Sequence, residues 1–177
     1  MSSRWKTPCL LPWLGASLLA AEIQPPQVPE NLRLPETEIV QLKVAGIGKQ
    51  IYACRENSQT PGLFEWVLQR PQADLINERG EKVGKHYQGP TWESIDGSRV
   101  VGELREQAAA PREGSIPWLL LRAKMTQGTG NLGRISYIQR VETIGGAAPA
   151  EGCDAAHAGH QVAIDYRAEY YFYTTRE

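Results

Sequence analysis

The densest group of side chains with binding chemistry lies between residues 86 and 96. The segment reads His-Tyr-Gln-Gly-Pro-Thr-Trp-Glu from His86 to Glu93 and is followed by Asp96. Aromatic rings stack on sugar or aromatic ligands, and carboxylates accept hydrogen bonds from hydroxyl groups. The alternative is that Trp92 only fills one end of a β-fold, since large aromatic side chains are usually buried. The predicted ligand-binding residues are His86, Tyr87, Trp92, Glu93, Asp96, Asp154 and His157.

Histidines elsewhere in the chain leave a metal site or an enzyme as alternatives. His157 and His160 are three residues apart with Asp154 beside them, and zinc and copper sites use such ligands. This spacing is not a strong metal signature, so surface or hydrogen-bonded histidines are favoured and we predict no cofactor. The rival interpretation is a hydrolase or metal-dependent enzyme that uses His86, Glu93 and His157, although the sequence has no G-x-S-x-G nucleophile motif.

Residues 128–133, GTGNLG, match the G-x-G-x-x-G fingerprint of dinucleotide-binding folds. That fingerprint works where a helix follows the loop, because the N-terminus of the helix holds the pyrophosphate. Residues 134–143 instead alternate in polarity like a strand. We therefore interpret 128–133 as a glycine-rich hairpin loop and predict that the protein is not a NAD-dependent dehydrogenase.

The first 21 residues have the layout of a secretory signal peptide. Arg4 and Lys6 precede an apolar stretch over 9–19, and Ala20 and Ala21 offer a small-residue cleavage point. The stretch is shorter than the roughly 20 residues that span a bilayer. We expect residues 1–21 to be removed and the mature chain to be exported to the periplasm or the extracellular space. A retained anchor is the alternative.

The cysteines agree with export. Of the three, Cys9 lies in the predicted signal peptide, which leaves Cys54 and Cys153 in the mature chain. An even pair in an exported protein predicts a disulfide, and two buried free thiols are the alternative.

Most of the chain alternates with a period of two, which is typical of half-buried strands. Residues 22–36 carry four prolines and form an extended leader. Turn signals at Gly80 and at Asp96-Gly97 predict hairpins over 73–87 and 91–105. Residues 116–123 are apolar at both parities, as in a strand buried on both faces. We predict one all-β domain over 37–177, an antiparallel sandwich or barrel of nine to ten strands.

Composition limits the partners. The 177 residues carry 19 Lys and Arg against 20 Asp and Glu, and no block of like charge stands out. We therefore expect no nucleic-acid partner. No apolar run after residue 21 is long enough to cross a membrane, so we expect no membrane span in the mature chain.

Seven segments occur in an order that resembles a known family. They are IYAC (51–54), FEWVLQRPQADLI (64–76), GKHYQGPTWE (84–93), DGSRVVG (96–102), IPWLLL (116–121), IQRVETIGG (138–146) and GCDAAHAG (152–159). Together they resemble the domain of unknown function family 3455 over residues 36–175. The resemblance implies no activity for individual residues. Some fungal members carry a malate dehydrogenase label, which the strand pattern after residue 133 argues against.

These observations favour an exported β domain that binds a ligand, and carbohydrate is the favoured ligand. The enzyme built on two histidines and a glutamate is one alternative. A structural envelope protein that binds no small ligand is another.

Overall fold

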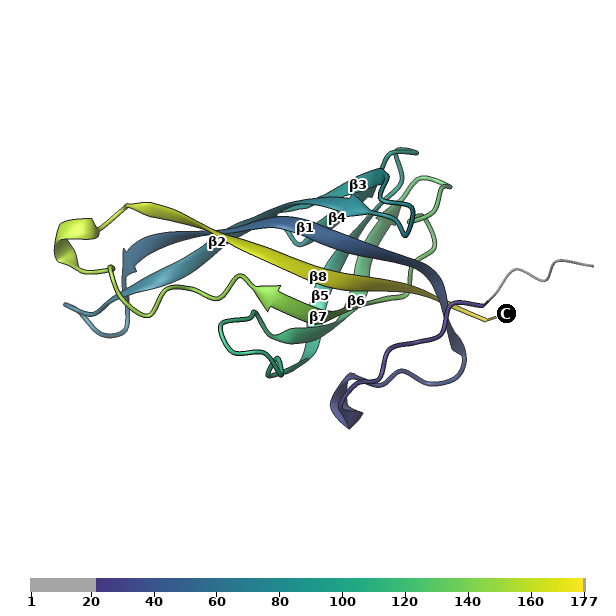
Figure 1. The fold of residues 1–177 in the computed structure, drawn as a ribbon, viewed down its shortest axis with the longest axis horizontal. Helices are drawn as coiled ribbons and strands as arrows, with labels where there is room; N and C mark the ends of the chain where they lie inside the picture. Colours follow the sequence, from purple (N-terminus) through teal and green to yellow (C-terminus); the bar gives the residue numbers. More distant parts are fainter. Residues whose placement is uncertain (1–21, 177) are drawn as a thin grey trace, which may run out of the picture.

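The computed structural model describes residues 22–176, which form eight antiparallel strands closed into a barrel (Figure 1). The strands are β1 (Glu38–Glu56), β2 (Phe64–Ile76), β3 (Lys82–Tyr87), β4 (Thr91–Ser94), β5 (Arg99–Ala108), β6 (Trp118–Gln127), β7 (Tyr137–Gly145) and β8 (Gln161–Thr175). Each strand pairs with the next, and β8 returns to pair with β1. Two 3-10 turns, η1 (Glu30–Leu32) and η2 (Ala155–His157), complete the elements. The predicted signal peptide over 1–21 lies outside the described residues.

The all-β prediction is confirmed, and the structure selects the barrel over the sandwich. The predicted count of nine to ten strands was too high, because alternating runs that look separate in the sequence join into single long strands. β1 alone has 19 residues and β8 has 15. Two glycines inside β1 serve close packing. A Cβ at Gly46 would collide with the ring of Tyr170, and one at Gly48 with the backbone of β2.

The local predictions around the turns are also confirmed. β2 and β3 form a hairpin whose turn contains Gly80 at φ 79°, and β4 and β5 form a hairpin whose turn contains Gly97 at φ 84°. Only glycine takes such angles without strain, so these two positions end the strands. β6 is buried on both faces near its start, where Leu121 packs inside the barrel and Trp118 packs outside it.

The outer core beneath Trp118 is covered by the leader. Residues 22–37 hold no strand, and Leu32 is fully buried against the outer wall together with Trp118 and Tyr173. The amide of Gln139 donates to the carbonyl of Leu32 at 2.5 Å, and Asn31 Nδ2 donates to the carbonyl of Gln107 at 3.0 Å. The leader is therefore docked along the barrel instead of extending away from it.

Part of β1, β2 and β8 continues beyond the barrel as an arm, seen at the left of Figure 1. Residues 64–72 of β2 pair with β1 but lie outside the register with β3, and residues 161–165 of β8 pair with β1 but lie outside the register with β7. The predicted disulfide between Cys54 and Cys153 is confirmed, with an S–S distance of 2.01 Å. It joins the arm to the loop over 146–160, which leads from β7 to β8.

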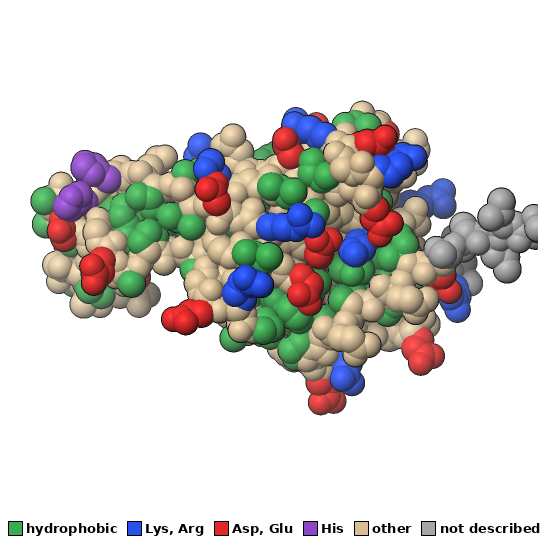
Figure 2. Space-filling model, viewed as in Figure 1, with side chains coloured by type: hydrophobic (Ala, Val, Ile, Leu, Met, Phe, Trp, Pro, Cys, Tyr) green, Lys and Arg blue, Asp and Glu red, His purple; other side chains and the backbone are tan. Residues whose placement is uncertain are grey.

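The surface mixes both signs of charge. Figure 2 shows Lys and Arg interspersed with Asp and Glu over the barrel, and histidines gathered at the end of the arm. Among residues 22–176, no helix has the length and apolar character that crossing a membrane requires.

Candidate functional site

A pocket opens at the end of the barrel that carries the β3–β4 and β5–β6 loops, and we call it the mouth pocket. Its volume is about 450 Å³, in the range of small-molecule sites. Eight-stranded barrels are just wide enough to fill with side chains or to hold one small ligand. Because side chains alternate along each strand, Leu119 and Leu121 of β6 point inward and form apolar walls. Trp92 of β4 also lines the pocket.

Two buried polar groups in the mouth pocket have no partner. Gln50 on β1 is 1% exposed, and neither its Oε1 nor its Nε2 has a hydrogen-bond partner among the described residues. Trp92 is also 1% exposed, and its indole Nε1 is likewise unpaired. Leaving such a group buried and unpaired costs about 1–3 kcal/mol. Native proteins rarely keep such groups without a reason, so the pair marks this pocket as a candidate binding site. Trp118 Nε1 is unpaired as well, but it lies on the outer wall.

We expect Gln50→Leu to raise the free energy of unfolding of the ligand-free protein by about 1–2 kcal/mol, because leucine removes the unpaired amide and keeps the volume. Gln139 supplies a matched control. It is 2% exposed, but its Nε2 donates to Leu32 and its Oε1 accepts from the Tyr173 hydroxyl at 2.5 Å. Gln139→Leu should therefore lower the free energy of unfolding by about 1–3 kcal/mol. Urea denaturation compares the two variants. Equal destabilisation by both would show that Gln50 serves the fold alone.

The mouth pocket is lined by two cations and no anion. Arg70 of β2 and Arg140 of β7 line it, whereas none of the lining residues is Asp or Glu. Nε and Nη2 of Arg140 donate to the carbonyl of Pro117 at 3.1 and 2.9 Å. Within residues 22–176, neither arginine has a carboxylate within ion-pair distance. The charge of the pocket is therefore positive.

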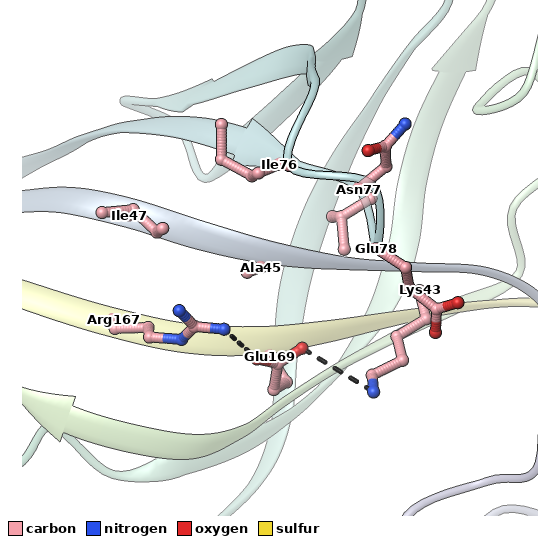
Figure 3. A pocket seen from close by; sticks show the side chains of 10 residues that line it. Lys43, Ala45, Ile47, Ile76, Asn77, Glu78, Arg167 and Glu169 are labelled. Atoms are coloured by element: carbon pink, nitrogen blue, oxygen red, sulfur yellow. Dashed lines mark hydrogen bonds and ion pairs between the residues drawn. The ribbon is translucent and has the colours of Figure 1, made fainter.

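A second hollow, drawn in Figure 3, lies on the outer face of β1 and β8. Lys43 Nζ lies 4.0 Å from Glu169 Oε2, and Arg167 Nη2 lies 3.0 Å from Glu169 Oε1. Three of the four charged side chains in this hollow, Lys43, Arg167 and Glu169, therefore pair with one another. No buried unpaired polar group of the described chain lines it. It is a weaker candidate than the mouth pocket.

The predicted cluster over 86–96 is divided between the two faces of the barrel wall. His86 is 3% exposed, and its ring stacks on Trp92 with centroids 4.3 Å apart. The His86 Nδ1 lies 2.8 Å from the carbonyl of Thr91, which can only accept, so Nδ1 carries the proton. Burial lowers the pKa of His86 to about 3, so the imidazole is neutral inside the core. Trp92 therefore packs in the barrel core and also lines the mouth pocket.

Tyr87 and Glu93 face the outside of the barrel. The Tyr87 hydroxyl donates to Glu93 Oε2 at 2.6 Å, and Lys85 Nζ lies 3.1 Å from Glu93 Oε1. The hydrogen bond from Tyr87 is the main cause that lowers the pKa of Glu93. The structure thus places these two predicted ligand-binding residues away from the mouth pocket.

Asp96 holds the opposite end of the barrel closed. Its Oδ1 accepts from the backbone N and Oγ of Ser98, and its Oδ2 accepts from the backbone N of Asn131 at 2.9 Å. The hydrogen bond from Ser98 is the largest cause that lowers the pKa of Asp96 to about 2. The glycine-rich segment over 128–133 is this bound loop, and it is followed by β7 and not by a helix. Leu132 in the loop is 1% exposed and packs in the barrel core.

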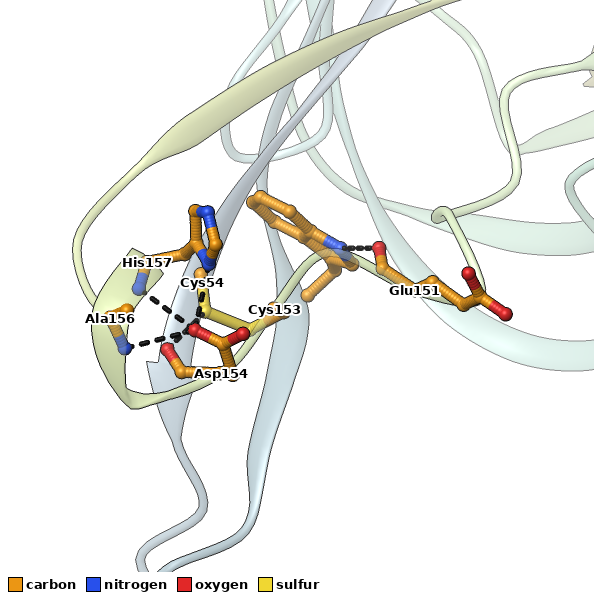
Figure 4. Close-up of a disulfide and its surroundings, with 7 residues drawn as sticks. Cys54, Glu151, Cys153, Asp154, Ala156 and His157 are labelled. Carbon is orange, nitrogen blue, oxygen red and sulfur yellow. Dashed lines mark hydrogen bonds and ion pairs between the residues drawn. A yellow bond between two sulfur atoms is a disulfide. The ribbon is translucent and has the colours of Figure 1, made fainter.

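Asp154 and His157 lie at the tip of the arm, beside the disulfide (Figure 4). Asp154 Oδ1 accepts from the backbone N of Ala156 and of His157 and lies 2.7 Å from His157 Nδ1. The hydrogen bond from His157 is the main cause that lowers the pKa of Asp154. The rings of His157 and His160 lie 5.4 Å apart. In the described part of the chain, no group of three or more His, Cys, Asp or Glu side chains could hold a metal ion.

The three residues of the enzyme alternative are therefore not brought together. His86 is inside the barrel, Glu93 is on its outer face, and His157 is on the arm. Gln50 and Arg140 were not predicted from the sequence. Their only local signal is a polar residue at an inward position of a strand, and that position becomes visible only once the register is known.

The family resemblance is confirmed. The family model described as "Protein of unknown function (DUF3455)" matches residues 35–174, so the chain belongs to this family. No curated protein and no solved structure matches the chain significantly.

Proposed function

We propose that this DUF3455 protein is an exported binding protein that holds a small, largely apolar ligand in the mouth pocket. The observation that carries the proposal is the pair of buried, unpaired groups at Gln50 and Trp92. Both line a pocket whose walls are otherwise mostly apolar. A ligand with one or two polar atoms would satisfy them and would cover the apolar walls at the same time.

The pocket supports a less polar ligand than the carbohydrate favoured by the sequence. Sugar sites combine a stacking aromatic ring with groups that accept hydrogen bonds from hydroxyls. Trp92 supplies a ring, but no carboxylate lines the pocket. Export is supported by the disulfide between Cys54 and Cys153, since such bonds persist in oxidising compartments. The enzyme alternative receives no support from the positions of its three residues.

A neutral fluorescent probe tests the proposal. We expect N-phenyl-1-naphthylamine, which fluoresces in apolar surroundings, to bind saturably at one molecule per chain. Leu119→Trp fills the pocket and should weaken binding at least ~10-fold, which corresponds to about 1.4 kcal/mol. Ile47→Trp, in the outer hollow of Figure 3, is the control and should bind the probe like the wild type. Circular dichroism checks that both variants fold. Absence of saturable binding, or equal binding by all three folded proteins, would refute the proposal.

A further inference from the structure

We propose that the ligand of the mouth pocket is a small apolar acid and that Arg140 binds its anionic group. This inference rests on the proposed function and adds the chemical class of the ligand. The pocket joins apolar walls to a cation that lacks an anionic partner, and a ligand that matches both parts has an apolar body and one negative charge.

Arg140 reaches the pocket from the inner face of β7. Ile138, two residues before it, is fully buried in the barrel core, and the alternation of the strand turns Arg140 to the same side. The charge of Arg140 acts on groups inside the barrel as well. Burial raises the pKa of Tyr52, and the charge of Arg140 opposes that rise. The half-buried guanidinium therefore lies at the boundary between the filled core and the open pocket.

The guanidinium is held in place by the protein but is not neutralised by it. Nε and Nη2 donate to the carbonyl of Pro117, which is an uncharged acceptor. An arginine has five N–H donors, and the two bonds to Pro117 use only some of them. The hydroxyl of Tyr170 also lies within reach of the guanidinium. A carboxylate or sulfonate can accept two of the remaining N–H groups side by side, and such charge-assisted bonds are among the strongest in proteins.

Other residues that line the pocket also fit an apolar acid. Gln50 and Trp92 line the pocket and add neutral hydrogen-bonding groups that have no partner among the described residues. Arg70 is exposed at the rim, where a second positive charge favours the approach of an anion. Leu119 and Leu121 cover the apolar body. A long polar chain or a cation would leave one of these parts unmatched.

Two probes that share one aromatic body test the inference. 1-Anilinonaphthalene-8-sulfonate carries an anion, and N-phenyl-1-naphthylamine is the same body without it. We expect the wild type to bind the sulfonate more tightly. Arg140→Gln should weaken binding of the sulfonate about 10- to 100-fold, as expected for hydrogen bonds to a charged group, and change binding of the neutral probe less than about 3-fold.

Arg122→Gln is the matched control, because it removes the same charge from an exposed position on β6 outside the pocket. It should leave both affinities unchanged. A second measurement needs no variant: 1-naphthoate should displace the neutral probe from the wild type at least about 10-fold more effectively than 1-naphthamide. This measurement decides the question if Arg140→Gln does not fold.

The outcomes separate the two proposals. If neither probe binds, the proposed function fails and this inference fails with it. If the neutral probe binds and the sulfonate binds no better, or if Arg140→Gln weakens both equally, the pocket remains a binding site and the anionic ligand is refuted.

Discussion

Replacing Cys153 with serine is expected to lower the free energy of unfolding by about 2–5 kcal/mol, the usual range for loss of a native disulfide. The bond closes a sequence separation of 99 residues. It also fixes the loop over 146–160 to the arm, where few other contacts do so. The indole of Trp66 donates to the carbonyl of Glu151 at 2.9 Å, and Cys54 exchanges two backbone hydrogen bonds with Gly159 and His160.

In Cys153→Ser, unfolding should begin in the arm. Its outer strands have one hydrogen-bonded neighbour each, so the arm lacks the support that closure gives the barrel. We expect new protease cleavage within 145–160 and faster hydrogen exchange in residues 161–165, measured together with urea denaturation. Ala150→Ser, an exposed change in the same loop, is the control. An unchanged urea midpoint and cleavage pattern for Cys153→Ser would contradict this prediction.

Acidification from pH 6.5 to pH 5 is expected to remove about 1.6 kcal/mol of stability through His86 alone. Burial lowers the pKa of His86 to about 3 in the folded protein, whereas an unfolded histidine titrates near 6.5. Between these values the unfolded chain binds more protons than the folded one. Stability is therefore complete above pH 6.5 and falls as the pH drops toward 3, at about 1.4 kcal/mol per pH unit.

A variant that keeps an aromatic ring at position 86 but removes the titratable imidazole tests this dependence of stability on pH. His86→Phe can still stack on Trp92, so its urea midpoint should change little between pH 6.5 and 5, whatever its absolute stability. Asp96 and Glu93 also have lowered pKa values, and they remove stability only at lower pH, as the pH falls through their folded values. A wild-type slope in His86→Phe would refute the assignment.

Local chemistry accounts for what could be predicted along the chain. Alternating polarity identified the strands, and Gly80 and Gly97 identified the turns, because these signals depend on neighbouring residues only. The cysteine count predicted the bridge for a similar reason, since the two cysteines outside the predicted signal peptide have one possible pairing. The strand count was too high because local pattern does not show where neighbouring runs join. Gly46 and Gly48 lie inside β1, where close packing against other strands lets one strand continue.

The candidate site could be predicted only in part. Trp92 was identified from its residue type, but its neighbours in the sequence were assigned to the same site. Adjacent residues on a strand face opposite sides, so Glu93 points outward while Trp92 points inward. The true neighbours of Trp92 in the pocket, Gln50 and Arg140, come from β1 and β7 and are far away in the sequence.

The sequence by itself therefore determined the all-β class, the turns, the disulfide and the family, because each depends on short-range pattern or on composition. Only the tertiary structure decided that the sheet closes into a barrel, that the leader covers its outer wall, and that a cationic pocket opens at one end. These features depend on register between distant strands, and a shift of one residue would turn Gln50 and Arg140 to the other face.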